Sequence, residues 1–257
     1  MARFPEPMDA EEETSVADLL PDSPSCFVVR SVLHRHAGRA WTSEPGDPLR
    51  ALVVERANGS GSCYCLGTDT VEIVRLLGGA PEWRWIRCLP EQSGALRNAL
   101  EAGKGRPVRS TRERVQRLIA PVVPIAHPWV RRLGEDDAEL LDGAAPALRP
   151  VGFQSSLAAL SGGVAAGAIV EGHLVGSVSM GLSSADHAEL TGGVLLPWRG
   201  RGIGTASISL VAATLQERAL IPVWTIDDDD PIARRVADKL GFETCGETVR
   251  FVREPRS

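Results

Sequence analysis

The chain has 257 residues, of which 43% are hydrophobic and 24% are charged, and its formal net charge is −5 at pH 7. A chain of this length can bury a substantial core and can form two modest domains. The negative charge argues against a general nucleic-acid-binding protein, which usually carries a basic surplus. No run of 18 apolar residues is present, and the acidic N-terminus lacks the apolar segment of a secretion signal. We therefore expect a cytoplasmic protein without a membrane span.

The N-terminal half predicts a flexible segment followed by a small α/β lobe. Residues 1–25 are acidic and interrupted by prolines, so we expect them to be flexible apart from one short helix. Residues 26–125 alternate between strand and helix signals and form the predicted lobe. The spacing Ser110-Thr111-Arg112-Glu113 is that of a capping box and predicts a helix through Ile119. Three prolines within 120–128 mark the predicted boundary of a second domain, 128–257.

The five cysteines are Cys26, Cys63, Cys65, Cys88 and Cys245. An odd number without regular spacing argues against a disulfide-stapled secreted domain. The alternation of Cys63 and Cys65 places both thiols on one face of a predicted strand, but no second Cys/His pair completes a metal site. We therefore expect buried, reduced cysteines and no metal.

The C-terminal half predicts a regular series of strands and helices. Two apolar runs joined by Glu171-Gly172-His173 are typical of a β-hairpin. A strand over 187–195 follows, and 222–227 is a short strand of buried type. Asp230 and Pro231 predict the N-cap and first residue of a helix that Gly241 ends.

The segment 195–206 is the most informative of the chain. Gly200, Gly202 and Gly204 alternate just before a predicted helix, so no Cβ keeps a ligand from the backbone. Their amides and the helix N-terminus make an anion site, which Arg199 and Arg201 flank. This arrangement predicts a phosphorylated cofactor.

The spacing of these residues excludes two common phosphate-binding motifs. No lysine follows the glycines as in a P-loop, and G-x-G-x-x-G fails because its third glycine would fall on Ile203 or Thr205. Arg199-x-x-Gly202-x-Gly204 fits the pattern [Arg/Gln]-x-x-Gly-x-[Gly/Ala]. This pattern resembles the acyl-CoA pyrophosphate loop of the GNAT N-acetyltransferase superfamily. The alternative is an ordinary glycine-rich turn that opens a helix.

The resemblance covers roughly the last half of the chain and implies an α/β (α+β) fold: a mixed, mostly antiparallel sheet flanked by helices. The N-terminal lobe resembles the degenerate front lobe of two-lobed GNAT proteins, although an unrelated α/β unit is the alternative. In either case we expect this lobe to shape the acceptor pocket or to form the contact of a homodimer.

The resemblance also implies an acetyl-CoA-dependent N-acetyltransferase, in which an unidentified amine attacks the thioester directly within a ternary complex. The alternative is a non-catalytic acyl-CoA-binding regulatory protein. The amides of the glycine-rich loop would bind the phosphates, and Arg201 would pair with the 3′-phosphate or face solvent. Val194 and Leu195 would bond the pantetheine arm, with Leu196 beside it. The expected cofactor-binding residues are Val194, Leu195, Leu196, Arg199, Gly200, Arg201, Gly202, Ile203, Gly204, Thr205, Asp230 and Ala233.

The catalytic residues are less well marked. Glu189 and His187 lie two apart on one strand and so face the same way. Some family members carry a glutamate base where Glu189 stands, whereas the alternative is that Glu189 is a surface acid. His187 is a second candidate for the base, and a positioned water can replace a side-chain base. Where many members have an Asn and a Tyr acid, this chain has Asp230, which an N-cap explains, and Ala237. The acidic run 227–230 is either a site for a cationic acceptor or a solvated loop.

Overall fold

The structure is a computed structural model that describes residues 5–43, 50–57, 61–102, 108–151, 153 and 155–253. The chain divides into two compact units. The first unit extends to Arg114 and also includes Asp227–Asp229 and the chain from Gly246 onward. The second unit consists of Val115–Ile226 and Asp230–Cys245. Strands β5 (Val108–Arg117) and β11 (Glu243–Arg253) therefore contribute residues to both units.

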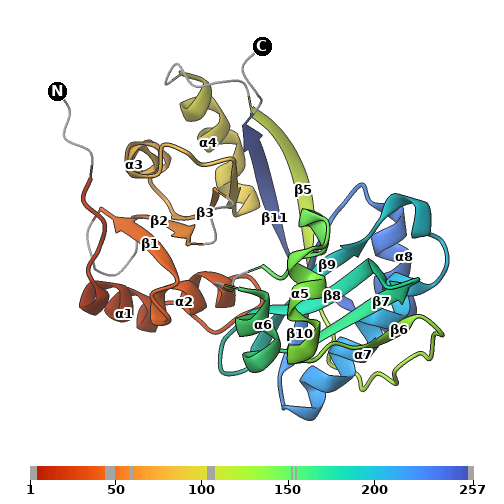
Figure 1. Ribbon diagram of the computed structural model, residues 1–257. Helices are drawn as coiled ribbons and strands as arrows, with labels where there is room; N and C mark the ends of the chain where they lie inside the picture. Colours follow the sequence, from red (N-terminus) through yellow and green to blue (C-terminus); the bar gives the residue numbers. More distant parts are fainter. Residues whose placement is uncertain are drawn as a thin grey trace. The chain divides into compact units, whose positions relative to one another are not determined.

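The first unit is built on a sheet whose strands follow the order β1-β2-β3-β4-β11-β5. The pairs β1–β2, β2–β3 and β4–β11 are antiparallel, whereas β3 and β4 are parallel. The other strands of this sheet are β1 (Gly38–Thr42), β2 (Ala51–Arg56), β3 (Ser62–Gly67) and β4 (Trp85–Cys88). The helices are α1 (Ala10–Leu19), α2 (Phe27–His34), α3 (Thr70–Leu76) and α4 (Pro90–Ala102), with a 3-10 turn at Leu77–Gly79 (Figure 1).

The core of the first unit includes the cysteines of β3. Cys63 and Cys65 are fully buried in one cluster with Trp41, Ile73 and Phe251. Burial, with a smaller contribution from the charge of Glu55, raises the pKa of the Cys63 thiol to about 12. The predicted burial of these two cysteines is therefore confirmed, and both are free thiols. Among the described residues, no cluster of three or more His, Cys, Asp or Glu side chains could hold a metal ion.

Of two local expectations for the N-terminal half, the short helix within the first 25 residues is present, whereas the helix over 110–119 is not. The described part of the first 25 residues contains α1, which Asp9 and Glu12 cap reciprocally and which buries Val16 completely. The predicted helix over 110–119 is wrong, because residues 110–117 belong to β5. The capping-box spacing is only a local signal, and here the Glu113 side chain is bonded to distant residues instead. The predicted division into 1–25, 26–125 and 128–257 stays a prediction.

The second unit contains the strand order β10-β9-β8-β7-β6. β10 and β9 are parallel, and the other pairs are antiparallel. The strands are β6 (Val130–Arg132), β7 (Ala165–Val170), β8 (His173–Ser183), β9 (His187–Val194) and β10 (Ile221–Asp227). The helices are α5 (Ala138–Asp142), α6 (Ser156–Gly162), α7 (Ile203–Glu217) and α8 (Pro231–Leu240), with 3-10 turns at Glu135–Asp137, Pro146–Leu148 and Leu196–Trp198. The predicted hairpin, the helix start at Pro231 and the helix end at Gly241 are all confirmed.

The order of elements repeats along the chain. The series of two helices, three strands, helix, strand, helix and strand runs from α1 to β5 and again from α5 to β11. In both halves the third of these strands is parallel to the strand that follows the next helix, as β3 is to β4 and β9 is to β10. This repeat supports the predicted two-lobed organisation. The fold is the predicted mixed α/β type with a mostly antiparallel sheet flanked by helices.

The last strand departs from this simple repeat. β11 ends the second half of the chain, yet its residues Val249–Val252 pair with Trp85–Cys88 of β4 in the first half. The division of the chain in space therefore differs from its division in sequence. Among the described residues, no helix has the length and apolar character needed to cross a membrane.

Candidate functional site

The glycine-rich turn lies between β9 and α7, as the sequence predicts. Gly200 has φ 75° and Gly202 has φ 83°, a left-handed backbone conformation that residues other than glycine rarely adopt. Gly202 is the N-cap of α7 and has no side chain with which to cap the helix. The glycines therefore give this turn its conformation and leave the start of α7 open.

The amides of this turn have no acceptor among the residues that the structure describes. The first amides of any helix lack an intrahelical acceptor, and the earliest such bond here runs from the Ala206 N–H to the Gly202 carbonyl at 3.0 Å. Within the described ranges, no backbone or side-chain acceptor is bound to the amides of residues 200–205. Unused donors at the positive end of a helix form an anion-binding site.

A cavity of about 400 Å³ lies beside the turn. Residues of β9, the turn, α7, β10 and α8 line it. Its polar lining includes the glycine-rich backbone, Arg199 and the N-cap Asp230, and its apolar lining includes Leu190, Trp224 and Val236. The cavity thus combines an anion-binding end with an apolar wall, which suits a ligand that is charged at one end and apolar along its length.

The cavity occupies the place where β9 and β10 separate. The two strands pair only from Ile221–His187 to Val223–Glu189, although β9 continues to Val194 and β10 continues beyond Val223. Past this point Trp224 and the backbone of 190–194 border the cavity. A strand edge without a neighbour carries unpaired backbone groups that can bind an extended ligand.

Most of the predicted cofactor-binding residues line this cavity. They are Val194, Arg199, Gly200, Gly202, Ile203, Gly204, Thr205, Asp230 and Ala233. The Val194 carbonyl already accepts a hydrogen bond from Arg199 Nε at 3.0 Å. Arg199 therefore packs back onto the end of β9.

Three predicted cofactor-binding residues lie outside the cavity lining. The Leu195 N–H donates to the Val175 carbonyl, and the Leu195 carbonyl accepts from the Trp198 N–H, so this backbone unit is already bonded. Leu196 is 76% exposed. The Arg201 guanidinium lies over the Trp198 ring, 4.9 Å from its centroid. Contacts of these three residues with a cofactor stay predictions.

The acidic run 227–230 is largely engaged within the protein. The Asp230 carboxylate accepts from the Ile232 and Ala233 amides, which confirms its interpretation as an N-cap. Asp227 is paired with Arg250, and Asp228 with Arg114. These bonds argue against the run as a ready site for a cationic acceptor.

Glu189 and His187 lie on β9 below the point of separation. Glu189 is half-buried, and its carboxylate lies over Gly181, where a Cβ would come within 2.5 Å of Oε2. The Leu182 N–H lies 3.4 Å from the same oxygen. His187 is buried, and its backbone is bonded to Ser184. Neither residue lines the cavity, so both catalytic roles stay predictions.

The helix α8 presents no tyrosine to the cavity. Ala237 is fully buried in the core, and the α8 residues that line the cavity beyond its cap are Ile232, Ala233 and Val236. The sequence analysis missed several lining residues, among them Trp224, Thr191 and Leu190. Trp224, a large side chain on β10, the strand that follows α7, is a signal that could have indicated this wall.

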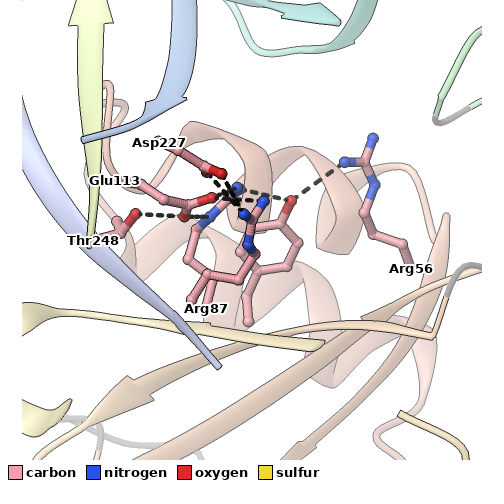
Figure 2. Close-up of polar contacts among 7 residues, drawn as sticks. Arg56, Arg87, Glu113, Asp227 and Thr248 are labelled. Atoms are coloured by element: carbon pink, nitrogen blue, oxygen red, sulfur yellow. Dashed lines mark hydrogen bonds and ion pairs between the residues drawn. The ribbon is translucent and has the colours of Figure 1, made fainter. Parts of the chain in front are cut away.

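Sequence analysis also missed a polar network in the first unit (Figure 2). Glu113 is 1% exposed and accepts two hydrogen bonds from Arg87, at 2.6 and 3.0 Å, and one from Thr248 at 3.1 Å. Arg250 lies 3.2 Å from Glu113 and also pairs with Asp227. Burial alone raises the pKa of Glu113, but the two guanidinium charges and these hydrogen bonds outweigh it, so the pKa lies below its usual value.

Tyr64 extends this network. Its hydroxyl oxygen is 3.3 Å from Nη1 of the buried Arg56 and 3.5 Å from Arg87 Nη1. The Arg87 guanidinium also lies 5.5 Å from the Tyr64 ring centroid. These residues come from β2, β3 and β4, so the network ties the strands of the first unit together. We assign it a structural role.

Comparison with known proteins agrees with this geometry. Residues 138–242 match the model of the acetyltransferase (GNAT) family. No curated protein matches the sequence. Similar solved structures include a GCN5-related N-acetyltransferase-like protein from Streptococcus suis 89/1591, with 17% identity, a TM-score of 0.73 and coverage of 95% of this chain and 99% of that one.

Two further structures share the fold over nearly the whole chain. A GCN5-related N-acetyltransferase from Kribbella flavida has 12% identity and a TM-score of 0.62, covering 94% of this chain and 96% of its own. A tandem GNAT protein from the clavulanic acid biosynthesis pathway has 14% identity and a TM-score of 0.58, covering 98% of each chain. Residues 138–242 therefore form a GNAT acetyltransferase domain, within a chain that has the fold of two-lobed GNAT proteins.

Proposed function

We propose that this protein transfers an acetyl group from acetyl-CoA to an amine. The observation that carries the proposal is the row of unbonded amides at residues 200–205, which opens into a cavity at the separation of β9 and β10. The diphosphate of CoA would bind these amides and the N-terminus of α7. The pantetheine arm would follow the free edge of β9 beside Trp224.

The chemistry follows from this placement. The amine nitrogen attacks the thioester carbonyl carbon, the C–N bond forms, and the C–S bond breaks as CoA leaves as a thiolate. The ammonium proton goes to a base, for which Glu189 is the candidate, directly or through a water. A CoA thiol resembles free Cys, with a pKa of about 8.5, so the thiolate can leave without a tyrosine acid. The enzyme contributes mainly by positioning, which can supply roughly 7–11 kcal/mol.

The acceptor is proposed only as an amine. Because Asp227, Asp228 and Asp230 are engaged within the protein, the acidic run does not by itself favour a polycationic acceptor. The class of amine stays open, and the candidates are amino acids, aminoglycosides, polyamines and the amines of proteins.

The test combines cofactor binding with turnover. CoA affinity is measured by calorimetry, and thiol release from acetyl-CoA is followed across a panel that represents each of these four amine classes. We expect CoA binding and thiol release that depends on at least one amine, with the acetylated amine identified by mass spectrometry. Tight CoA binding with no release for any amine would contradict the enzymatic role, and absence of CoA binding would contradict the site itself.

A further inference from the structure

The segment that joins the two halves of the chain lies against the start of α7. We propose that His127, in this segment, is a positioning residue that aims the Gly202 N–H into the cavity by holding the Arg201 carbonyl. The inference rests on the proposed function, because it assigns the aimed N–H to the diphosphate of CoA. Its evidence lies wholly within the second unit.

The joining segment, residues 118–129, is fixed along α7. The Gln216 side chain donates to the Leu118 and Ala120 carbonyls at 3.2 and 2.9 Å and accepts from the Val122 N–H at 3.0 Å. Further along, the Ile125 N–H donates to Ser209 Oγ at 2.9 Å. Gln216 lies near the end of α7 and Ser209 near its middle, so the segment runs back toward the helix N-terminus. These bonds bring His127 to the glycine-rich turn.

Both ring nitrogens of His127 are engaged. The Trp129 N–H points to Nδ1 at 3.3 Å, and Nε2 lies 3.0 Å from the Arg201 carbonyl oxygen. A backbone N–H can only donate and a carbonyl oxygen can only accept. Nδ1 must therefore be the acceptor and Nε2 must carry the hydrogen, which selects one neutral tautomer of the imidazole.

The peptide between Arg201 and Gly202 links this hydrogen bond to the direction of the Gly202 N–H. In a planar trans peptide the carbonyl oxygen and the following N–H point in opposite directions. A donor that holds the Arg201 oxygen on one side therefore fixes the Gly202 N–H toward the other side, where Gly202 lines the cavity. Such a bond also polarises the peptide and strengthens its N–H as a donor.

Aromatic packing supports the same turn. The His127 and Trp129 rings are edge to face with centroids 5.4 Å apart, and Trp129 meets Trp198 in the same way at 5.5 Å. Arg201 lies over Trp198. The turn is thus held by rings on one side and by the His127 hydrogen bond at its carbonyl, while its amides stay unbonded.

The test separates the hydrogen bond from the shape of the ring. His127→Gln keeps an N–H donor that can reach the Arg201 oxygen, whereas His127→Phe keeps the ring and loses the donor. His173→Phe, at an exposed histidine at the start of β8, is the matched control. Affinities for CoA and for inorganic diphosphate, the latter by competition, are measured for each variant together with the thermal midpoint.

We expect His127→Phe to lower the affinities for CoA and for inorganic diphosphate about three- to tenfold, because one hydrogen bond is lost. His127→Gln and His173→Phe should stay within about twofold of the unchanged protein. Ile232→Ala, at the apolar wall, should lower the affinity for CoA and leave the affinity for diphosphate unchanged. If His127→Phe is unstable, His127→Ala replaces it.

Three results would overturn the inference: unchanged affinities in His127→Phe, a loss for CoA without a loss for diphosphate, or a loss in His127→Gln equal to that in His127→Phe. A loss that only accompanies a lower thermal midpoint and that Gln does not restore indicates a merely structural role. Failure of the unchanged protein to bind CoA would instead refute the proposed function, so the two failures are distinguishable.

Discussion

The turn before α3 in the first unit and the turn before α7 in the second unit follow equivalent strands but use their amides differently. Before α3, the Asp69 carboxylate accepts from the Glu72 N–H and pairs with Arg50, and the Asp69 N–H donates to the Arg50 carbonyl. Before α7, Gly202 offers no side chain and the amides stay unbonded. The N-terminus of α3 is thus capped by a carboxylate of the protein, and we call the turn before it the filled turn. The N-terminus of α7 has no such cap, and we call the turn before it the open turn.

The strands beneath these turns differ in the same sense. β3 pairs with β4 along the whole of β4, from Trp85 to Cys88, whereas β9 and β10 separate after Glu189. A cavity of about 410 Å³ also lies at the turn before α3. A hollow at a helix N-terminus is therefore not enough to form an anion-binding site, because the first amides of the helix must also be unused.

The largest expected effect lies in the polar network of the first unit. Glu113→Ala should lower the free energy of unfolding by about 3–5 kcal/mol, because it leaves the Arg87 and Arg250 charges without their buried partner. Chemical denaturation measures this effect. CoA affinity of the folded protein should stay unchanged, since the network lies in the first unit. A fall below 1 kcal/mol would show that the network is not structural.

The next effect tests the open turn. Gly202→Glu should weaken CoA binding at least a hundredfold, because a carboxylate beside a diphosphate costs several kcal/mol and the left-handed φ is strained. The matched control is Gly94→Glu in α4, where nothing lies within 4 Å of an added Cβ. Calorimetric titration of both variants measures the difference. Retained affinity in Gly202→Glu would remove the turn from the binding site.

A third effect concerns the proposed base on β9. Glu189→Gln should lower kcat/KM about a hundredfold near neutral pH, the lower range of general-base contributions. Glu171→Gln, in the exposed hairpin turn, is the control. The measurement is the pH–rate profile with the amine that the panel identifies. An unchanged kcat/KM through neutral pH would exclude Glu189 from the mechanism.

The acid stability of the protein should also depend on Glu113. Its folded pKa lies below its unfolded value of about 4.3, so its contribution is present above that pH and is lost as the pH falls through the folded pKa. Unfolding free energies measured from pH 6 downward should therefore fall less steeply in Glu113→Gln. Equal slopes in the two proteins would contradict the low pKa.

The smallest expected effect is at the filled turn. Asp69→Ala should lower the thermal midpoint slightly, because the Glu72 N–H loses its cap. It should not create a second CoA site, since β3 remains paired with β4. Calorimetry should give one CoA per chain before and after the change. A stoichiometry of two would show that the Asp69 cap alone keeps the first unit from binding CoA.

The sequence predicts what depends on local signals. The glycine spacing at 200–204, the cap Asp230-Pro231 and the hairpin turn at Glu171 each act within a few residues, and the structure confirms all three elements. The strand at 108–117 was missed because the bonds of Glu113 go to residues as distant as Thr248. The engaged backbone of Leu195 depends in the same way on Val175 of β8, which no local pattern reveals.

The most direct test of the open turn is a titration of isotopically labelled protein with CoA, followed through its backbone amide resonances. We expect the amides of Gly200, Gly202 and Gly204 to shift strongly on binding, as donors to a diphosphate do, while the amide of Glu72 in the filled turn stays in place. Saturating CoA that moves neither group, or that moves Glu72 instead, would contradict the account.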